Sequence, residues 1–97
     1  MTKRALLMAA GDDVATVIDR VAAGEDVAVS TKQGAVVSEL TSLDDVDLYH
    51  KLALHDIAKG SLVRKYGEVI GRATDDIAQG AHVHTHNIAS VKTRNDD

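Results

Sequence analysis

Apolar residues occur along the chain in short runs that glycine and acidic residues interrupt. The first run, residues 5–10, ends at Gly11-Asp12-Asp13, which predicts a buried strand followed by a turn. Two further runs, residues 27–31 and 35–40, flank the polar segment Lys32-Gln33-Gly34 and predict a hairpin. From residue 49 onward, short apolar segments continue to alternate with turn signals. These signals are Lys59-Gly60, Tyr66-Gly67, Gly71 and Gln79-Gly80.

One segment leaves the choice between helix and strand open. Four apolar residues after Asp12-Asp13 have the i, i+3, i+4, i+7 spacing of a short helix that either aspartate could cap. All four are β-branched, which favours a strand almost as strongly. They are Val14, Val17, Ile18 and Val21. We therefore expect a mainly β fold of short kinked strands with at most one or two short helices.

A short motif recurs in the chain. Residues 53–60 are echoed by residues 73–80, and residues 21–27 form a weaker third copy. All three reduce to Ile/Val-Ala-x-Gly-x-x-Val, which predicts an apolar residue, a tight turn at glycine and a following strand. The period is not kept along the whole chain, so a solenoid is not expected. The repeat instead indicates long strands folded back on themselves.

Composition limits what this chain can do alone. Its 97 residues make one domain, and without Phe or Trp the core must consist of small aliphatic side chains. Such a domain can hardly enclose a substrate pocket of several hundred Å³, so a site shared at an interface is expected. Residues 92–97 contain no apolar residue, and we expect a domain over residues 1–91 followed by a flexible tail.

Charge and cysteine content exclude several functional classes. The formal net charge of −4, without a basic face, argues against binding to nucleic-acid phosphates. The absence of cysteine excludes disulfides, iron–sulfur clusters and thiolate zinc sites. No apolar run is long enough for a secretion signal or a membrane span. These features predict a cytoplasmic protein without a membrane partner.

The stretch Gly80-Ala-His-Val-His-Thr-His-Asn87 carries the strongest chemical signal. On a strand, His82, His84 and His86 would share one face, with Val83 on the opposite, core-facing side. Residues two apart on a strand are separated by roughly 6.6 Å and residues four apart by roughly 13 Å. Because metal–nitrogen bonds are only about 2.1 Å long, at most two of the three can bind one ion unless the strand bends sharply. The structural alternative is a solvated strand face.

Other polar groups have simpler structural interpretations. Asp76 matches Asp56 in the repeat, which predicts turn capping rather than acid–base work for Asp75-Asp76. Asp44, Asp45 and Asp47 lack the glycine and the distal glutamate of a calcium loop. The glycines of residues 66–71 do not have phosphate-loop spacing. His50 and His55 are expected to be structural or surface residues.

Three segments together resemble a known family. Residues 51–60, 64–74 and 77–87 are similar to the SAF domain of the altronate/galactarate dehydratase family, with KYGEVIGRAT and HVHTHN as the specific parts. The resemblance covers about residues 5–90 and is strongest over 49–88. It implies a β-clip fold. In this family the domain is the N-terminal part of a long chain or a separate small subunit.

The resemblance also implies a function. Its enzymes are metal-dependent hydro-lyases, with iron(II) or manganese(II) as the expected ion, that dehydrate a sugar acid to a 2-keto-3-deoxy acid. We expect His84 and His86 to be catalytic residues and metal ligands. His82 ranks behind them as a ligand and, with Asn87, is expected to contact substrate. The base that removes the α-proton is expected on a large catalytic subunit, so the chain alone should be inactive.

Two alternatives stay open at this point. A small subunit of sulfolactate sulfo-lyase, which eliminates sulfite from a similar acid, would carry the same motifs. A SAF module that binds a carbohydrate or a protein without catalysis would also satisfy them. Self-association of the isolated chain is a further possibility, and substrate stereochemistry is not encoded in these motifs.

Overall fold

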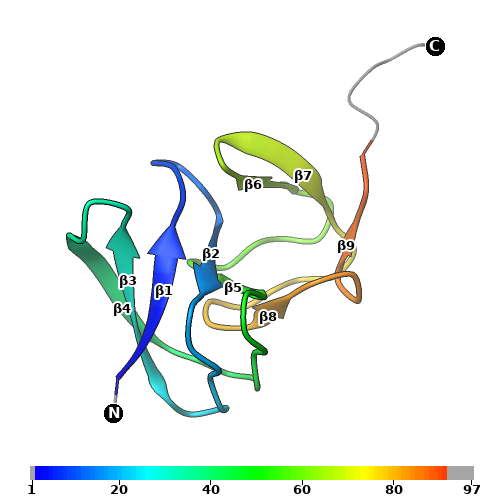
Figure 1. Ribbon diagram of the computed structural model, residues 1–97. Helices are drawn as coiled ribbons and strands as arrows, with labels where there is room; N and C mark the ends of the chain where they lie inside the picture. The colour runs from blue at the N-terminus through cyan, green and yellow to red at the C-terminus, as the bar shows by residue number, and fades with distance from the viewer. Residues whose placement is uncertain (1, 92–97) are drawn as a thin grey trace.

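The computed structural model describes residues 2–91, so the predicted tail at residues 92–97 lies outside the described part (Figure 1). This part contains strands and turns but no helix, which confirms the mainly β prediction. Within it, no helix is present that could cross a membrane. The strands are β1 (Lys3–Leu7), β2 (Val14–Val17), β3 (Asp26–Thr31), β4 (Val36–Thr41), β5 (Lys51–Ala53), β6 (Leu62–Lys65), β7 (Glu68–Ala73), β8 (His82–Val83) and β9 (Ile88–Ala89).

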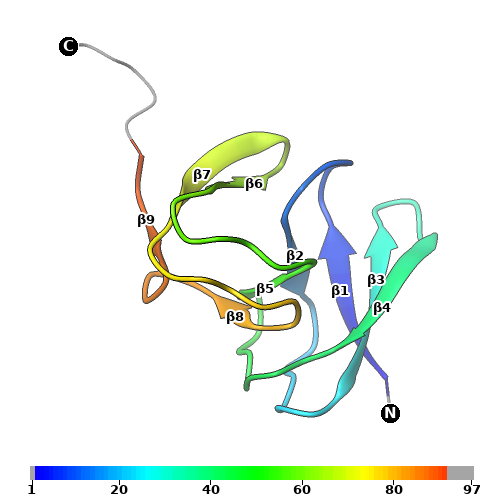
Figure 2. The same ribbon diagram turned by 180° about the vertical axis from the view of Figure 1, so that it is seen from behind.

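The strands form two sheets. The larger has the order β4-β3-β1-β2-β5-β8, and the smaller has the order β6-β7-β9. Strands β1 and β3 pair in parallel, whereas every other described pair is antiparallel. Figures 1 and 2 show the smaller sheet beside the β2–β5–β8 side of the larger one, away from β4. The predicted hairpin around Gly34 is confirmed as the β3–β4 connection.

Two clusters of small aliphatic side chains form the core. The first lies in the larger sheet around Val17, Val29 and Leu52, and the second joins the two sheets around Val14, Val63 and Val83. Neither cluster contains an aromatic ring, as the composition predicts. Strand β8 is the edge strand of the larger sheet. Its residue Val83 is buried in the second cluster and fixes the position of the strand.

The ambiguous segment after Asp13 is a strand, so the helical interpretation is wrong. All four residues of β2 are buried, because it pairs with β1 on one side and with β5 on the other. Asp12 therefore does not cap a helix, and it instead binds backbone N–H groups in two loops. Its carboxylate accepts hydrogen bonds from the backbone N–H groups of Ala9, Tyr66 and Gly67 at 3.1, 2.9 and 2.8 Å. Asp12 thus ties the β1–β2 connection to the β6–β7 hairpin.

The turn predicted at Gly71 is also wrong, because this residue lies within β7. A Cβ atom at Gly71 would lie 2.6 Å from the carbonyl oxygen of Ala89 in β9. Glycine is therefore required there for the close approach of two strands rather than for a turn. The other turn signals fall in turns, and Tyr66-Gly67 forms the tip of the β6–β7 hairpin with both residues at positive φ.

The sequence repeat corresponds to a structural repeat with four copies. Each copy starts with an isolated bridge residue, and these residues pair as Val21 with Val46 and Ile57 with Ile77. The fourth copy, residues 46–52, escaped the sequence motif because only Val46 matches it, with Asp47, Tyr49 and Leu52 at the Ala, Gly and Val positions. Tyr49 nevertheless has a positive φ of 68°, close to the 86–91° of the other three copies.

In the pair of copies joined by Ile57 and Ile77, an aspartate of each copy caps the turn of the other copy. The carboxylate of Asp76 accepts the backbone N–H of Lys59 at 2.8 Å, and that of Asp56 accepts the N–H of Gln79 at 2.9 Å. This reciprocal arrangement confirms the capping role predicted for Asp76. It also fixes the turn that leads into β8, and with it the position of the histidine-rich stretch.

Candidate functional site

The histidine-rich stretch is not the straight strand that its alternating pattern predicts. Strand β8 ends at Val83, and the chain then turns so that the N–H groups of Asn87 and Ile88 both donate to the His84 carbonyl oxygen at 3.1 Å. The expected shared strand face for all three histidines is therefore wrong. The bend that the distance argument allowed for is present, and it begins at His84.

The amide of Asn87 stabilises this turn. Its Oδ1 atom accepts the backbone N–H of His84 at 2.9 Å, and its Nδ2 atom donates to the carbonyl oxygen of His82 at 2.8 Å. The side chain is buried, with the residue only 8% exposed. Asn87 thus has a structural role in holding the two histidines, and the substrate contact expected from it stays a prediction.

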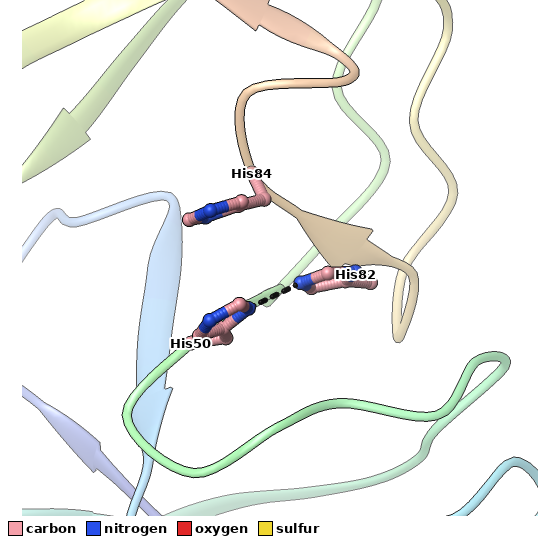
Figure 3. A group of neighbouring side chains, drawn as sticks. All are labelled: His50, His82 and His84. Atoms are coloured by element: carbon pink, nitrogen blue, oxygen red, sulfur yellow. Dashed lines mark hydrogen bonds between the residues drawn. The ribbon is translucent and has the colours of Figure 1, made fainter.

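Strand pairing brings a third histidine to the site. Strands β5 and β8 are antiparallel with Lys51 opposite Val83, so the residues just beyond this pair, His50 and His84, face each other. Their rings stack with centroids 4.2 Å apart and planes inclined by 16°. His50 Nδ1 lies 2.9 Å from His82 Nε2 (Figure 3). His50, expected to be structural or on the surface, is therefore part of this cluster.

His50, His82 and His84 lie close enough together that they could hold a metal ion. One ring nitrogen from each lies within 4.8 Å of the other two. Two nitrogens bound at right angles with bonds of about 2.1 Å would be about 3.0 Å apart, close to the His50–His82 separation. In addition, Nδ1 of His84 is buried without a hydrogen-bond partner within residues 2–91. Imidazole nitrogens are suitable ligands for iron, zinc, copper and nickel.

The remaining histidines lie outside this group of three. His86 is exposed, and its ring is tilted by 39° against that of His82 at a centroid distance of 5.1 Å. Its assignment as a ligand stays a prediction. His55 is held elsewhere, with Nε2 at 2.9 Å from a carboxylate oxygen of Asp13 and Nδ1 at 2.9 Å from the Asp56 carbonyl oxygen. These contacts agree with the structural interpretation of His55.

The surroundings favour neutral imidazoles in the cluster. Burial lowers the pKa of His82 below 6.5, and the neighbouring His86, His50 and His84 lower it further. Burial also lowers the pKa of His84, with additional effects from His50 and Lys51. A neutral ring nitrogen has a free lone pair, so both shifts prepare these side chains to bind a cation at neutral pH.

Lys51 is a second residue at the site that the sequence did not single out. It follows His50 directly and is partly buried. Burial lowers its pKa, and the nearby Lys65 adds to this effect. The sequence carried no signal for either residue, because the fourth repeat copy shares only Val46 with the motif and aligns His50 with Ala81 and Lys51 with His82.

A wide groove borders the cluster. It has a volume of about 710 Å³ and is open to solvent. Charged residues line it in ion pairs, with Arg20 Nε at 3.1 Å from Asp47 Oδ1 and Lys3 Nζ at 3.9 Å from Glu25 Oε1. Because the groove is open and its charges are exposed, it presents polar groups to a small molecule without enclosing it. Two of the three clustered histidines, His50 and His82, contribute to its lining.

Comparison with known proteins identifies the family. Residues 3–91 match the family model described as the altronate/galactarate dehydratase SAF domain. The chain belongs to this family. The match covers the whole β-sheet structure described above, including the cluster and the turn at Asn87. The resemblance inferred from the sequence is thereby confirmed.

Similar proteins include enzymes and enzyme subunits. Altronate dehydratase of Escherichia coli (strain K12) is 46% identical over 76 residues, which are 78% of this chain but 14% of that protein. The (2R)-sulfolactate sulfo-lyase subunit alpha of Chromohalobacter salexigens is 43% identical over 49 residues, 50% of this chain and 52% of that protein. The corresponding subunit of Paracoccus pantotrophus is 46% identical over 48 residues, 50% of this chain and 72% of that protein.

Proposed function

We propose that this SAF chain is the small subunit of a two-component hydro-lyase that converts a sugar acid to a 2-keto-3-deoxy acid. Its role is to supply histidines to a metal site that it shares with a large catalytic subunit. The single observation that supports this most directly is the convergence of His50, His82 and His84 beside an open groove. Altronate dehydratase is a relative in which the matching stretch is 14% of the protein, so most of that enzyme lies outside a SAF domain.

The proposed elimination needs three functions. A base removes the proton next to the carboxylate, a cation stabilises the negative charge that develops there, and an acid protonates the departing hydroxyl group. The clustered histidines would hold the cation, with iron(II) or manganese(II) as the expected ion, and its charge would serve the second function. His86 is exposed next to His82 and could donate the proton to the leaving group. We assign the base to the large subunit.

A sulfo-lyase small subunit is the second candidate. Two relatives named (2R)-sulfolactate sulfo-lyase subunit alpha are at least 43% identical to this chain, and the match covers 52% and 72% of their lengths. Both candidates start with removal of a proton next to a carboxylate and differ in the leaving group, water in one case and sulfite in the other. The polar, open groove does not favour either leaving group.

The proposal is tested by purifying the tagged chain from its source cells and identifying its partner. The expected partner is a protein homologous to the part of altronate dehydratase that lies outside the matched stretch. The purified complex is then supplied with a metal and assayed with altronate and with (2R)-sulfolactate, and the keto acid and sulfite are measured. Turnover of altronate by the complex, with none by either component alone, is expected.

Turnover of sulfolactate alone would instead support the second candidate. Full activity of the large subunit without this chain would contradict both candidates, because neither then needs the histidines. A chain that captures no such partner and binds a sugar acid without turnover would be a non-catalytic SAF module.

A further inference from the structure

Both tyrosines of the chain are exposed and have positive φ values. Tyr49 has a φ of 68° and is 68% exposed, and Tyr66 has a φ of 58° and is 57% exposed. A side chain with a Cβ atom is strained in this conformation, which glycine adopts freely. Because the chain has no Phe or Trp, its two tyrosines are its only large aromatic side chains besides the histidines, and both are on the surface in strained turns. Such outliers suggest that the side chain has a function outside the fold.

Tyr66 has local contacts that Tyr49 lacks. The ammonium groups of Lys32 and Lys65 lie 5.5 and 5.2 Å from the centroid of the Tyr66 ring. These are cation–π distances, so part of the Tyr66 side chain is used within the domain. Within residues 2–91, the Tyr49 hydroxyl makes no hydrogen bond and its ring has no cation above it.

The repeat shows that the fold does not need a tyrosine at position 49. The other three copies have Gly24, Gly60 and Gly80 at the equivalent position, and all of them form the same turn. A glycine would therefore be accepted at position 49 with less strain. The tyrosine must be explained by what its side chain contacts outside this domain.

Tyr49 is one of three exposed apolar residues in the segment that leads to His50. We call Leu43, Leu48 and Tyr49 the Tyr49 rim, and these residues are 53%, 39% and 68% exposed. Leu48 and Tyr49 directly precede His50. The N–H of Leu43 donates to the carbonyl oxygen of Gly80, two residues before His82, at 2.9 Å. The rim therefore comes from segments that adjoin both strands of the cluster.

We propose that the Tyr49 rim is the surface on which the large catalytic subunit docks, with Tyr49 as the main contact. This inference rests on the proposed function. The matching stretch is 14% of altronate dehydratase, so the groups that complete the histidine site must come from a much larger partner. A partner that reaches the cluster also covers the adjacent rim. Tyrosine is among the residues that dominate binding energy at such interfaces.

Charge indicates the chemistry of the partner surface. The segment of the rim, residues 43–49, contains Asp44, Asp45 and Asp47 and no basic residue. All three aspartates are exposed, and Asp47 is paired with Arg20. Asp44 and Asp45 accept only the backbone N–H groups of His82 and Ala23 and form no ion pair within residues 2–91, so they carry the charge argument. The docking surface of the large subunit is therefore expected to combine an apolar depression for Tyr49 with surrounding Lys or Arg residues.

The test compares three variants of the chain in complex with the purified large subunit. Tyr49→Gly is expected to weaken binding by about tenfold or more, as loss of a dominant interface side chain does. Its melting temperature should be equal to or higher than that of the wild-type chain, because the strained conformation is relieved. Tyr49→Phe keeps the ring and should restore most of the affinity. Tyr66→Gly, with the same backbone conformation, is the matched control and should bind as tightly as the wild type.

The possible failures are distinguishable. If the wild-type chain binds the large subunit and Tyr49→Gly binds equally well, the docking surface is overturned while the proposed function stands. The same holds if Tyr66→Gly weakens binding as much as Tyr49→Gly, or if Tyr49→Gly abolishes only self-association in analytical ultracentrifugation. If the wild-type chain binds no homologue of the remaining part of altronate dehydratase, the proposed function fails, and the docking surface fails with it.

Discussion

At the scale of single residues, His50 links the repeat to the chemistry. It follows Tyr49 in the fourth turn, and strand pairing places it opposite His84. The sequence placed three histidines in one stretch and preferred His84 and His86 as the pair, with His82 behind them. The structure instead groups His82 and His84 with a residue from another strand, and His86 lies outside this group. The position of His50 depends on a long-range strand pairing that spacing alone does not show.

Metal affinity should depend on His50 and His84 more than on His86. His50→Ala and His84→Ala each remove one of the three clustered nitrogens. We expect each to weaken binding of manganese(II) or iron(II) by at least about 10- to 100-fold, because loss of a residue that merely orients a ligand already costs that much. His55→Ala is the control, because His55 contacts Asp13 and Asp56 instead. Isothermal titration calorimetry of the isolated chain under anaerobic conditions measures the affinities. A larger loss for His86→Ala than for His50→Ala would assign the site to His84 and His86 instead.

Acidification should destabilise the metal-free chain through His82. The folded pKa of His82 lies below its ordinary value of 6.5, chiefly because of burial. The unfolded chain thus takes up this proton at a higher pH, so the stabilising effect is present above about pH 6.5 and is lost as the pH falls through the folded pKa. Urea unfolding between pH 8 and pH 5 measures the trend. His82→Gln should make it less steep.

His55 provides a contrast with the opposite sign. Its pKa is raised, mainly by the hydrogen bond to the Asp56 backbone and also by Asp13. Its contribution to stability is therefore present below about pH 6.5 and is lost as the pH rises through its folded pKa. In an NMR titration of the histidine rings, His82 should titrate below His55. The reverse order would contradict the cluster geometry.

At the scale of elements, the glycine turns differ in what surrounds them. Gly24 and Gly80 occupy equivalent positions with φ values of 91° and 86°. A Cβ atom at Gly24 would meet nothing within 4 Å, whereas one at Gly80 would overlap the carbonyl oxygen of Thr41. The turn before β8 is thus packed against Thr41 at the end of β4. The segment after β4 also holds His82, whose backbone N–H donates to the carboxylate of Asp44.

Two alanine substitutions should separate backbone strain from packing. Gly24→Ala adds only the strain of a positive φ, and we expect it to lower the free energy of unfolding by about 1–2 kcal/mol. Gly80→Ala adds a steric overlap and is expected to cost clearly more and to weaken metal binding, because it displaces the start of β8. Urea unfolding and metal titration of both variants measure this. Equal stability losses would show that the loop yields to the added methyl group.

Asp12 is the second element-scale feature with a measurable consequence. It is 5% exposed and accepts three backbone N–H groups from two connections. Asp12→Ala leaves these donors without a partner and should lower the free energy of unfolding by about 3 kcal/mol or more. The control is Asp26→Ala, since Asp26 is exposed and bonds only the Thr41 hydroxyl in the side-chain contacts described. Similar losses for both variants, measured by urea unfolding, would contradict the capping role of Asp12.

The sequence predicted the strands and turns correctly where they depend only on residues close together in the chain. The glycines and the apolar runs predicted most strands and turns. The segment after Asp13 was ambiguous because its apolar residues have helical spacing, whereas their β-branched side chains favour a strand. Pairing with β1 and β5 makes it a strand. Gly71 was misinterpreted as a turn because glycine is required there by the close approach of Ala89, which is distant in the sequence. The fourth repeat copy was missed because it keeps only the first residue of the motif, and its turn is formed by a tyrosine in a conformation typical of glycine.

At the scale of the whole molecule, the clustered histidines sit at a join between distant segments. In the chain, β5 and β8 are separated by strands β6 and β7 of the other sheet, yet their pairing creates the site. The core around them consists of small aliphatic residues, which limits the area that folding removes from water. A bound cation would therefore contribute a large share of the stability of such a small domain.

This share is measurable, because a ligand that binds only the folded chain raises its stability by mass action. At a free metal concentration 100 times the dissociation constant, the gain is about 2.7 kcal/mol. For a domain of this size, that corresponds to a rise in melting temperature of about 10 °C or more. Since protonated imidazoles cannot bind the cation, the rise caused by iron(II) under anaerobic conditions should be smaller at pH 5.5 than at pH 8. Magnesium, which prefers oxygen ligands, is the control. An equal rise in the triple variant His50→Ala, His82→Ala, His84→Ala would place the metal elsewhere, because no convergent imidazole nitrogens would remain in the cluster to bind it.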